Sequence, residues 1–147
     1  MQRVSDLLNH KGRAIWSLAP DATVFEALEE MAHKRVGALL VMEGERLVGI
    51  FSERDYARKV ILLGKSSRKT RVREIMSRSV VCARPDLTVE ESMALMTEKR
   101  VRHLPVVVEK RVVGVISIGD VVRSLIEDQE VHIQELTDYI TGGSPSR

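Results

Sequence analysis

Aromatic residues, cysteine and long apolar runs are all scarce in this sequence. Phe, Trp and Tyr make up 3% of the 147 residues, so the core must be built from aliphatic side chains. Cys82 is the single cysteine, which excludes an intrachain disulfide and a thiolate metal cluster. No apolar run approaches the roughly 20 residues needed to cross a bilayer, and the first residues lack the apolar core of a signal peptide. We therefore expect a soluble, cytoplasmic protein with no membrane partner.

A strong excess of charge of either sign is also missing. The 23 Lys and Arg residues nearly balance the 21 Asp and Glu residues, for a net charge of +2. That value is too small to favour a nucleic-acid or membrane surface. The most basic stretch, residues 65–73, is interpreted as a solvated linker, although it is the best candidate for a nucleic-acid contact. We expect no nucleic-acid partner.

An internal repeat organises the sequence. The segment Ala19–Val24 returns as Arg84–Val89, 65 positions later, and this register holds without a gap from Pro20 to Arg123. Two copies in register over this length indicate a duplication.

The segments that precede the two copies match at a different spacing. Val4–Leu8 resembles Val72–Met76 at an offset of 68, so the first copy carries three extra residues between positions 9 and 14.

Each copy predicts the order β-α-β-β-α, preceded by a short helix, and hence an α+β fold. Capping boxes at Thr23 and Thr88 begin the first helix of each copy, and Ser52 and Ser117 begin the second. The strands are short apolar runs, in which near-continuous apolarity indicates that both sheet faces are covered. The predicted strands are residues 15–18, 38–42 and 47–51 in the first copy, and 80–83, 104–108 and 112–116 in the second.

These patterns divide the chain into five parts. The first repeat, with its N-terminal helix, spans residues 1–64, and a linker spans 65–71. The second repeat spans 72–124. A further helix is predicted over 125–141, and residues 142–147 are predicted to form a disordered tail.

Several motifs occur twice and in register. One is Pro20-Asp21-x-Thr23-Val24, which returns at Pro85. Another is Gly49-Ile50-Phe51-Ser52-x-x-Asp55, which returns as Gly114-Val115-Ile116-Ser117-x-x-Asp120. In combination these motifs resemble the CBS-domain family, and specifically a stand-alone tandem CBS pair, the Bateman module.

The resemblance implies a fold and a ligand class. Two βαββα repeats would pack through their sheets about a pseudo-twofold axis, leaving two equivalent clefts. Family members bind adenine nucleotides there, including AMP, ATP, NAD(H) and S-adenosylmethionine. The Ser/Thr-x-x-Asp motif of one repeat holds the ribose, while the first strand and the Val-x-x-x-Pro segment of the other repeat enclose the adenine.

Transferred to this sequence, the first cleft would hold the ribose on Ser52 and Asp55, with Arg54 between them. The residues of the other repeat that would enclose the nucleotide are Val80, Val81, Cys82, Val101, Arg102, His103 and Pro105.

The second cleft would use Ser117 and Asp120, with Gly119 in place of the arginine. The opposing residues would be Ile15, Trp16, Ser17, Val36, Gly37 and Ala38. An ionised Asp accepts hydrogen bonds from both sugar hydroxyls, and guanidinium groups bind phosphate oxygens in pairs. We therefore expect the first cleft to hold phosphates more firmly, and the second to be weaker or to admit a bulkier ligand.

Simpler interpretations stand beside these. Ser52-x-x-Asp55 is also an ordinary helix cap, worth about 1 kcal/mol without any ligand. Arg54 and Arg102 could be plain surface charges. His103 could contact a phosphate or pack within its strand.

The leading functional hypothesis is a regulatory module that senses an adenine nucleotide, with AMP favoured, and signals to a protein partner that the sequence does not identify. The alternative is a dimeric interaction scaffold with vestigial clefts, and we expect a homodimer in either case. The sequence contains no Walker loop, Gly-x-Ser-x-Gly elbow or His-Glu-x-x-His motif. We therefore expect no enzymatic activity, no required cofactor and no bound metal.

Overall fold

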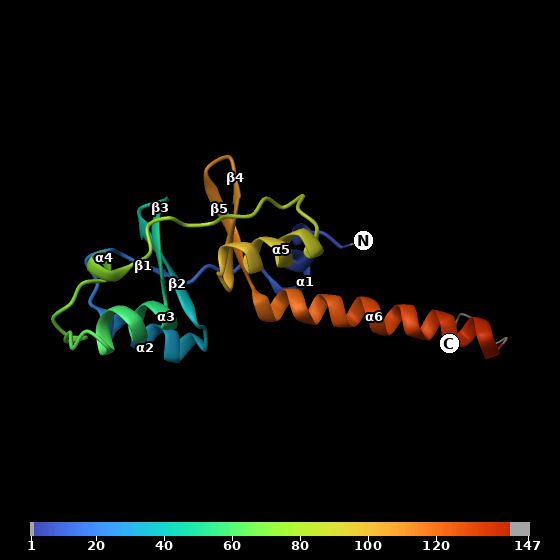
Figure 1. The fold of residues 1–147 in the computed structure, drawn as a ribbon. Coiled ribbons are helices and arrows are strands. Elements are labelled where there is room, and N and C mark those ends of the chain that lie inside the picture. Colours follow the sequence, from blue (N-terminus) through green and yellow to red (C-terminus); the bar gives the residue numbers. More distant parts are fainter. Residues whose placement is uncertain (1, 142–147) are drawn as a thin grey trace.

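A computed structural model describes residues 2–141 as two similar halves, each built on a small sheet (Figure 1). The first half contains β1 (Ser17–Leu18), α2 (Val24–Lys34), β2 (Ala38–Glu43), β3 (Arg46–Ser52), α3 (Glu53–Tyr56) and the π-helical turn η1 (Ala57–Ile61). The second half contains α5 (Val89–Lys99), β4 (His103–Val108), β5 (Arg111–Ser117) and α6 (Ile118–Thr141). Two short helices, α1 (Val4–Lys11) and α4 (Val72–Ile75), precede the halves in the chain. The predicted α+β fold is confirmed.

The predicted capping residues begin the long helix of each half. The Thr23 hydroxyl accepts from the amide of Glu26 at 3.1 Å, and the Thr88 hydroxyl accepts from the amide of Glu91 at 3.1 Å. Both helices end on an arginine in the left-handed conformation, Arg35 after α2 and Arg100 after α5. The chain thereby turns sharply into β2 and β4.

The two sheets differ by one strand. In the first half β1 runs parallel to β2, which pairs antiparallel with β3. The sequence predicts an equivalent strand over residues 80–83, but only Ala83 forms a bridge, with Val106. The cause is Pro105, which stands 65 positions after Leu40. Leu40 donates its amide to the carbonyl of Trp16 at 3.1 Å, whereas proline has no amide to donate.

The short N-terminal helices are exchanged between the halves. Val4 and Leu8 of α1 are fully buried in the core that also holds Met96 and Ile116 of the second half. Conversely, α4 is buried in the core of the first half. Figure 1 shows α1 beside α5, at the opposite end of the body from α2. The helix that the sequence groups with residues 1–64 therefore packs with the second half.

Two glycines allow this close packing. A Cβ on Gly114 of β5 would lie 2.6 Å from Cδ2 of Leu8, and a Cβ on Gly49 of β3 would lie 2.6 Å from Sδ of Met76. Distances this short are not tolerated between real side chains. The repeated glycine of each half thus marks the point where the exchanged segment crosses its sheet.

Helix α6 extends well beyond the body of the molecule (Figure 1). The predicted C-terminal helix over 125–141 is continuous with the second helix of the second repeat, so that one helix of 24 residues replaces two. The predicted tail, 142–147, lies outside the described residues. None of the helices within residues 2–141 is long and apolar enough to cross a membrane.

Candidate functional site

A cavity of about 590 Å³ lies between the two halves. Its first wall is the end of β3 and the start of α3, including Ile50, Ser52 and Asp55. The opposite walls are residues 77, 79–81, 100–103 and 117–119, which all belong to the second copy or to the segment leading into it. The volume falls within the range of about 300–1,000 Å³ that small-molecule sites occupy. We call this cavity the first cleft.

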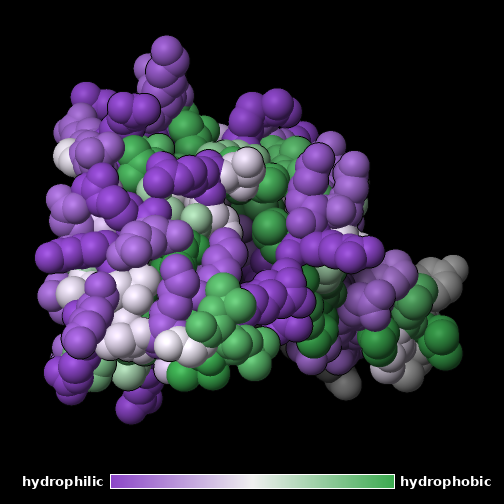
Figure 2. All heavy atoms as spheres, turned by 60° about the vertical axis from the view of Figure 1, so that its left-hand side comes forward, coloured by the Kyte–Doolittle hydropathy of each residue, from purple (hydrophilic) through white to green (hydrophobic). Residues whose placement is uncertain are grey.

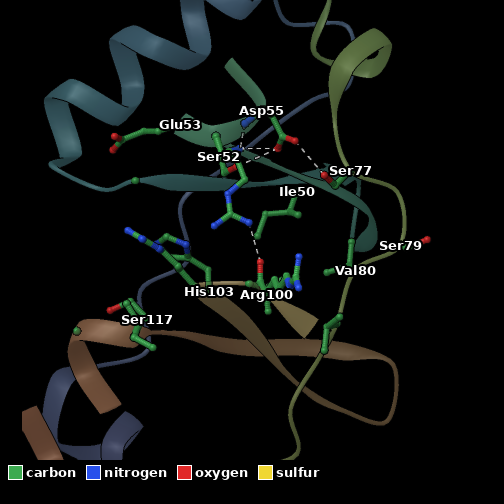
Figure 3. Close-up of a pocket in the computed structure, with 17 residues that line it drawn as sticks. Ile50, Ser52, Glu53, Asp55, Ser77, Ser79, Val80, Arg100, His103 and Ser117 are labelled. Carbon is green, nitrogen blue, oxygen red and sulfur yellow. Dashed lines mark hydrogen bonds between the residues drawn. The ribbon is translucent and has the colours of Figure 1, made fainter. Parts of the chain in front are cut away.

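Asp55 is 6% exposed, and its carboxylate is fully hydrogen-bonded. Oδ2 accepts from the amide of Ser52 at 2.9 Å and from its hydroxyl at 3.1 Å. Oδ1 accepts from the hydroxyl of Ser77 at 3.0 Å and pairs with Nζ of Lys59 at 3.1 Å. Figure 3 shows the carboxylate turned toward Ser77, with the Ser52 hydroxyl beside it. The capping interpretation of Ser52-x-x-Asp55 is therefore real, and a ligand that engages Asp55 must exchange with one of these donors.

The two hydroxyl donors and the lysine differ in position. Ser52 and Ser77 line the first cleft. Lys59 lies outside that lining and donates a second bond, to the carbonyl of Ile75 at 3.1 Å. The donors to Asp55 that face the cavity are therefore neutral, and the positively charged Lys59 contacts the carboxylate from outside the cavity wall.

Cationic side chains collect on the other side of the first cleft. Arg54 reaches across it and donates to the carbonyl of Arg100 at 2.8 Å, so that its guanidinium connects the two halves. Arg100 and Arg102 also belong to the lining. These three arginines give this side of the cavity a positive charge.

A second cavity of about 410 Å³ also lies between the two halves. Its lining includes Trp16 and residues 35–38 of the first copy, together with Ser117 and Asp120 of the second. We call it the second cleft. Gly37, Ile50, His103 and Ser117 line both clefts, so the two cavities adjoin along these residues.

Asp120 in the second cleft has different partners from Asp55. It is 8% exposed, and its Oδ2 accepts from the amide of Ser117 at 2.8 Å and from Nζ of Lys11 at 2.6 Å. Oδ1 accepts from Arg123 at 3.0 Å. Burial acts to raise the pKa of this carboxyl, but the hydrogen bonds and charge supplied by Lys11 and Ser117 outweigh it, and the pKa lies below its ordinary value. Lys11 and Ser117 thus favour the ionised form of Asp120.

His103 stands between the clefts and is half-buried. Burial lowers the pKa of its imidazole, against the raising effect of Asp120. Lys11 lowers it further, Glu53 raises it, and Arg102 lowers it. The imidazole is therefore favoured in its neutral form in the absence of an added anion.

Most residues predicted for the first cleft lie in its wall: Ser52, Arg54, Asp55, Val80, Val81, Val101, Arg102 and His103. Two do not. Pro105 is buried within β4, and Cys82 lies outside the lining, with its Sγ 3.9 Å from the carbonyl of Val80.

The residues predicted for the second cleft divide between the cavities. Its lining includes Trp16, Val36, Gly37, Ala38, Ser117 and Asp120. Gly119 lies instead in the lining of the first cleft. Ile15 and Ser17 are outside both linings, as expected where neighbours of Trp16 in an extended chain point to the opposite face.

Sequence reasoning missed two residues that bind the buried aspartates from distant parts of the chain. Ser77 follows α4, and Lys11 ends α1, in the loop that carries the three extra residues. The three extra residues in the first copy were the signal in the sequence that could have pointed to them. A connection of different length brings different side chains to each cleft, so the hydrogen-bond donors there should differ. Among the described residues, no group of three or more His, Cys, Asp or Glu side chains is arranged to hold a metal ion.

Comparison with known proteins identifies the architecture. The sequence model of the CBS domain matches residues 4–61 and 72–127. The chain is 39% identical to the mitochondrial CBS domain-containing protein CBSX3 of Arabidopsis thaliana, over 95% of this chain and 72% of that protein. A putative signal-transduction protein with CBS domains from Burkholderia ambifaria has a similar structure, with a TM-score of 0.85 and 47% identity, covering 87% of this chain and 96% of that one.

One solved neighbour contains ligands. The CBS domain pair of protein MJ0100, in complex with 5′-methylthioadenosine and S-adenosyl-L-methionine, superimposes with a TM-score of 0.75 at 25% identity. The match covers 87% of this chain and 98% of that one.

Proposed function

Since the chain belongs to the CBS-domain family as a tandem pair, we propose that it is a regulatory module that binds an adenine nucleotide, with AMP favoured, in the first cleft. One observation carries this proposal. Ser52 and Asp55 of the first repeat face Val80, Val81 and Val101 of the second across a single cavity of about 590 Å³. A carboxylate–hydroxyl pair suited to a sugar and an apolar wall suited to a base therefore line the same cavity.

The chemistry of each wall supports this ligand class. A ribose hydroxyl replaces a serine hydroxyl on Asp55 at little cost, because both donors are neutral. Val80, Val81 and Val101 offer an apolar surface to a purine. Arg54 and Arg102 supply guanidinium groups for the phosphate. The adenosine-containing ligands of the MJ0100 pair are further support.

Nucleotide binding across the halves would act as a signal. A phosphate that attracts Arg54 competes with the carbonyl of Arg100, which now holds that guanidinium at 2.8 Å. The contact between the halves then changes with occupancy, and a partner protein that contacts both halves reads the change.

Thermal unfolding with AMP tests the proposal. A ligand at 100 times its dissociation constant stabilises the folded state by about 2.7 kcal/mol, or roughly 5–10 °C in the midpoint for a chain of this size. Asp55→Ala should abolish the shift, and Asp86→Ala, which changes an exposed carboxylate outside both clefts, should preserve it. No shift with AMP, ATP, NADH or S-adenosylmethionine at millimolar concentration would contradict the proposal.

A second candidate function is self-association through α6. Ile126, Ile133, Leu136 and Ile140 recur at spacings of three, four and seven residues and are between 49% and 81% exposed. Figure 2 shows apolar side chains on this projecting helix. Such a stripe is typical of a helix that pairs with another. Light scattering should find a dimer or larger assembly that Leu136→Glu weakens, and a monomer at all concentrations would exclude it.

A further inference from the structure

Lys11 places a positive charge on the aspartate of the second cleft. It is the last residue of α1, and its Nζ donates to Oδ2 of Asp120 at 2.6 Å and to the carbonyl of Val115 at 2.9 Å. The lysine is 36% exposed, while Asp120 is 8% exposed. The ammonium therefore closes over a nearly buried carboxylate.

In the first cleft, neutral donors from the cavity wall contact the corresponding carbonyl and carboxylate, and the one cation on Asp55, Lys59, lies outside that wall. Ile50 and Asp55 stand 65 positions before Val115 and Asp120. The amide of Ser77 donates to the carbonyl of Ile50 at 2.9 Å, and its hydroxyl donates to Oδ1 of Asp55 at 3.0 Å. One ammonium in the second cleft thus contacts the carbonyl and the carboxylate that a backbone amide and a serine hydroxyl contact in the first, although it binds Oδ2 where Ser77 binds Oδ1.

The Lys11–Asp120 pair also separates the second cleft from a neighbouring cavity. These two residues line the second cleft, and both line a further cavity of about 410 Å³ between α1 and α6. Arg123, the partner of Oδ1, belongs to the lining of that further cavity. The carboxylate oxygen left for a ligand in the second cleft is Oδ2, which Lys11 and the Ser117 amide occupy.

The two clefts differ in the free energy needed for a ligand hydroxyl to replace a donor on the aspartate. In the first, a ribose hydroxyl replaces a serine hydroxyl, one neutral donor for another. In the second, it must displace an ammonium from a carboxylate, and a charge-assisted hydrogen bond is about twice as strong as a neutral one. Losing it weakens binding by about 10- to 100-fold.

We propose that Lys11 is a specificity-determining residue that closes the second cleft to nucleotides, so that the chain binds one nucleotide, in the first cleft. The inference rests on the proposed function. It adds that the two clefts differ because of a residue outside both Ser-x-x-Asp motifs.

Titration calorimetry with AMP tests this on the full chain. The wild-type protein should bind one AMP per chain. Lys11→Gln supplies a neutral donor like that of Ser77, and should bind a second AMP at least about tenfold more tightly than the wild-type second cleft does. Lys11→Met should do the same if it folds, as judged by its circular dichroism spectrum. Lys69→Met, which removes an exposed lysine from the segment between the repeats, should still bind one.

The remaining outcomes separate the two proposals. A Lys11→Gln variant that also carries Asp120→Ala should return to one site. Wild-type protein that binds two AMP molecules with equal affinity would overturn the role of Lys11 and leave the nucleotide function standing. So would a folded Lys11→Gln protein that binds one AMP exactly as the wild type does. No binding to the wild type or to the variants would overturn both proposals.

Discussion

The contact between Leu8 and Gly114 sets the position of α1, and a double-mutant cycle on this pair tests the exchanged packing. Leu8 is fully buried in the core of the second half. Replacing it with Ala should cost about 2–5 kcal/mol of unfolding free energy, the range for buried leucines. Gly114→Ala places a Cβ 2.6 Å from Cδ2 and 3.1 Å from Cδ1 of Leu8. Overpacking of this kind costs about 1–3 kcal/mol.

The two changes should not add. Leu8→Ala removes both atoms that the new Cβ meets, so Gly114→Ala in that background should cost close to nothing. The coupling free energy, measured by urea unfolding followed by circular dichroism, should then be about 1–3 kcal/mol. Gly49→Ala is the matched control, because its Cβ would meet Met76 in the other half, and it should add to Leu8→Ala within about 0.5 kcal/mol. An identical cost for Gly114→Ala in both backgrounds would refute the packing of α1 on β5.

Three further predictions concern the charged groups of the clefts. Arg102→Ala should weaken AMP by about tenfold or more and leave adenosine unchanged in calorimetry, since it removes a guanidinium that meets only the phosphate; equal weakening of both ligands would deny it that role. Burial lowers the pKa of His103 in the free protein, and the negative charge of a bound phosphate should raise it again. AMP should therefore bind more tightly to the wild type than to His103→Gln as the pH falls from 8 to 6. The phosphate itself titrates in both proteins, so identical pH profiles would exclude the histidine. The lowered pKa of Asp120 contributes stability that is present above the ordinary Asp pKa of about 3.9 and is lost as the pH falls through the lower folded value; urea midpoints of Lys11→Gln should therefore fall less steeply below about pH 4 than those of the wild type.

The elements that the sequence predicted well are those set by local chemistry. Thr23 and Thr88 cap their helices because a threonine hydroxyl and an amide three residues on lie within one turn. The hairpins follow from two apolar runs on either side of a short polar turn. Each of these depends on residues that are neighbours in the chain.

The features that were missed depend on contacts between distant segments. The repeat offsets could match α1 with α4 but could not say that each helix is buried in the other half. The segment 80–83 is apolar, as a strand would be, but it pairs only at Ala83 because of a proline more than 20 residues away at position 105. The candidate clefts also divide into local and distant features. The Ser-x-x-Asp motifs, which are local, lie in the predicted walls, whereas Ser77 and Lys11, which come from distant segments, were found only in the structure.

The exchange of helices and the difference between the clefts have one origin in the chain. Because α1 is buried in the second half, the segment that returns from it to β1 must pass the second cleft, and it brings Lys11 to Asp120. Because α4 is buried in the first half, the chain that leaves it passes the first cleft and brings Ser77 to Asp55. The donor that each cleft receives is therefore decided by the length and sequence of a connection, which changes without disturbing either Ser-x-x-Asp motif. A duplicated pair can in this way keep two intact motifs and still offer a ligand one carboxylate with serine hydroxyls on its cavity side and another with a lysine there.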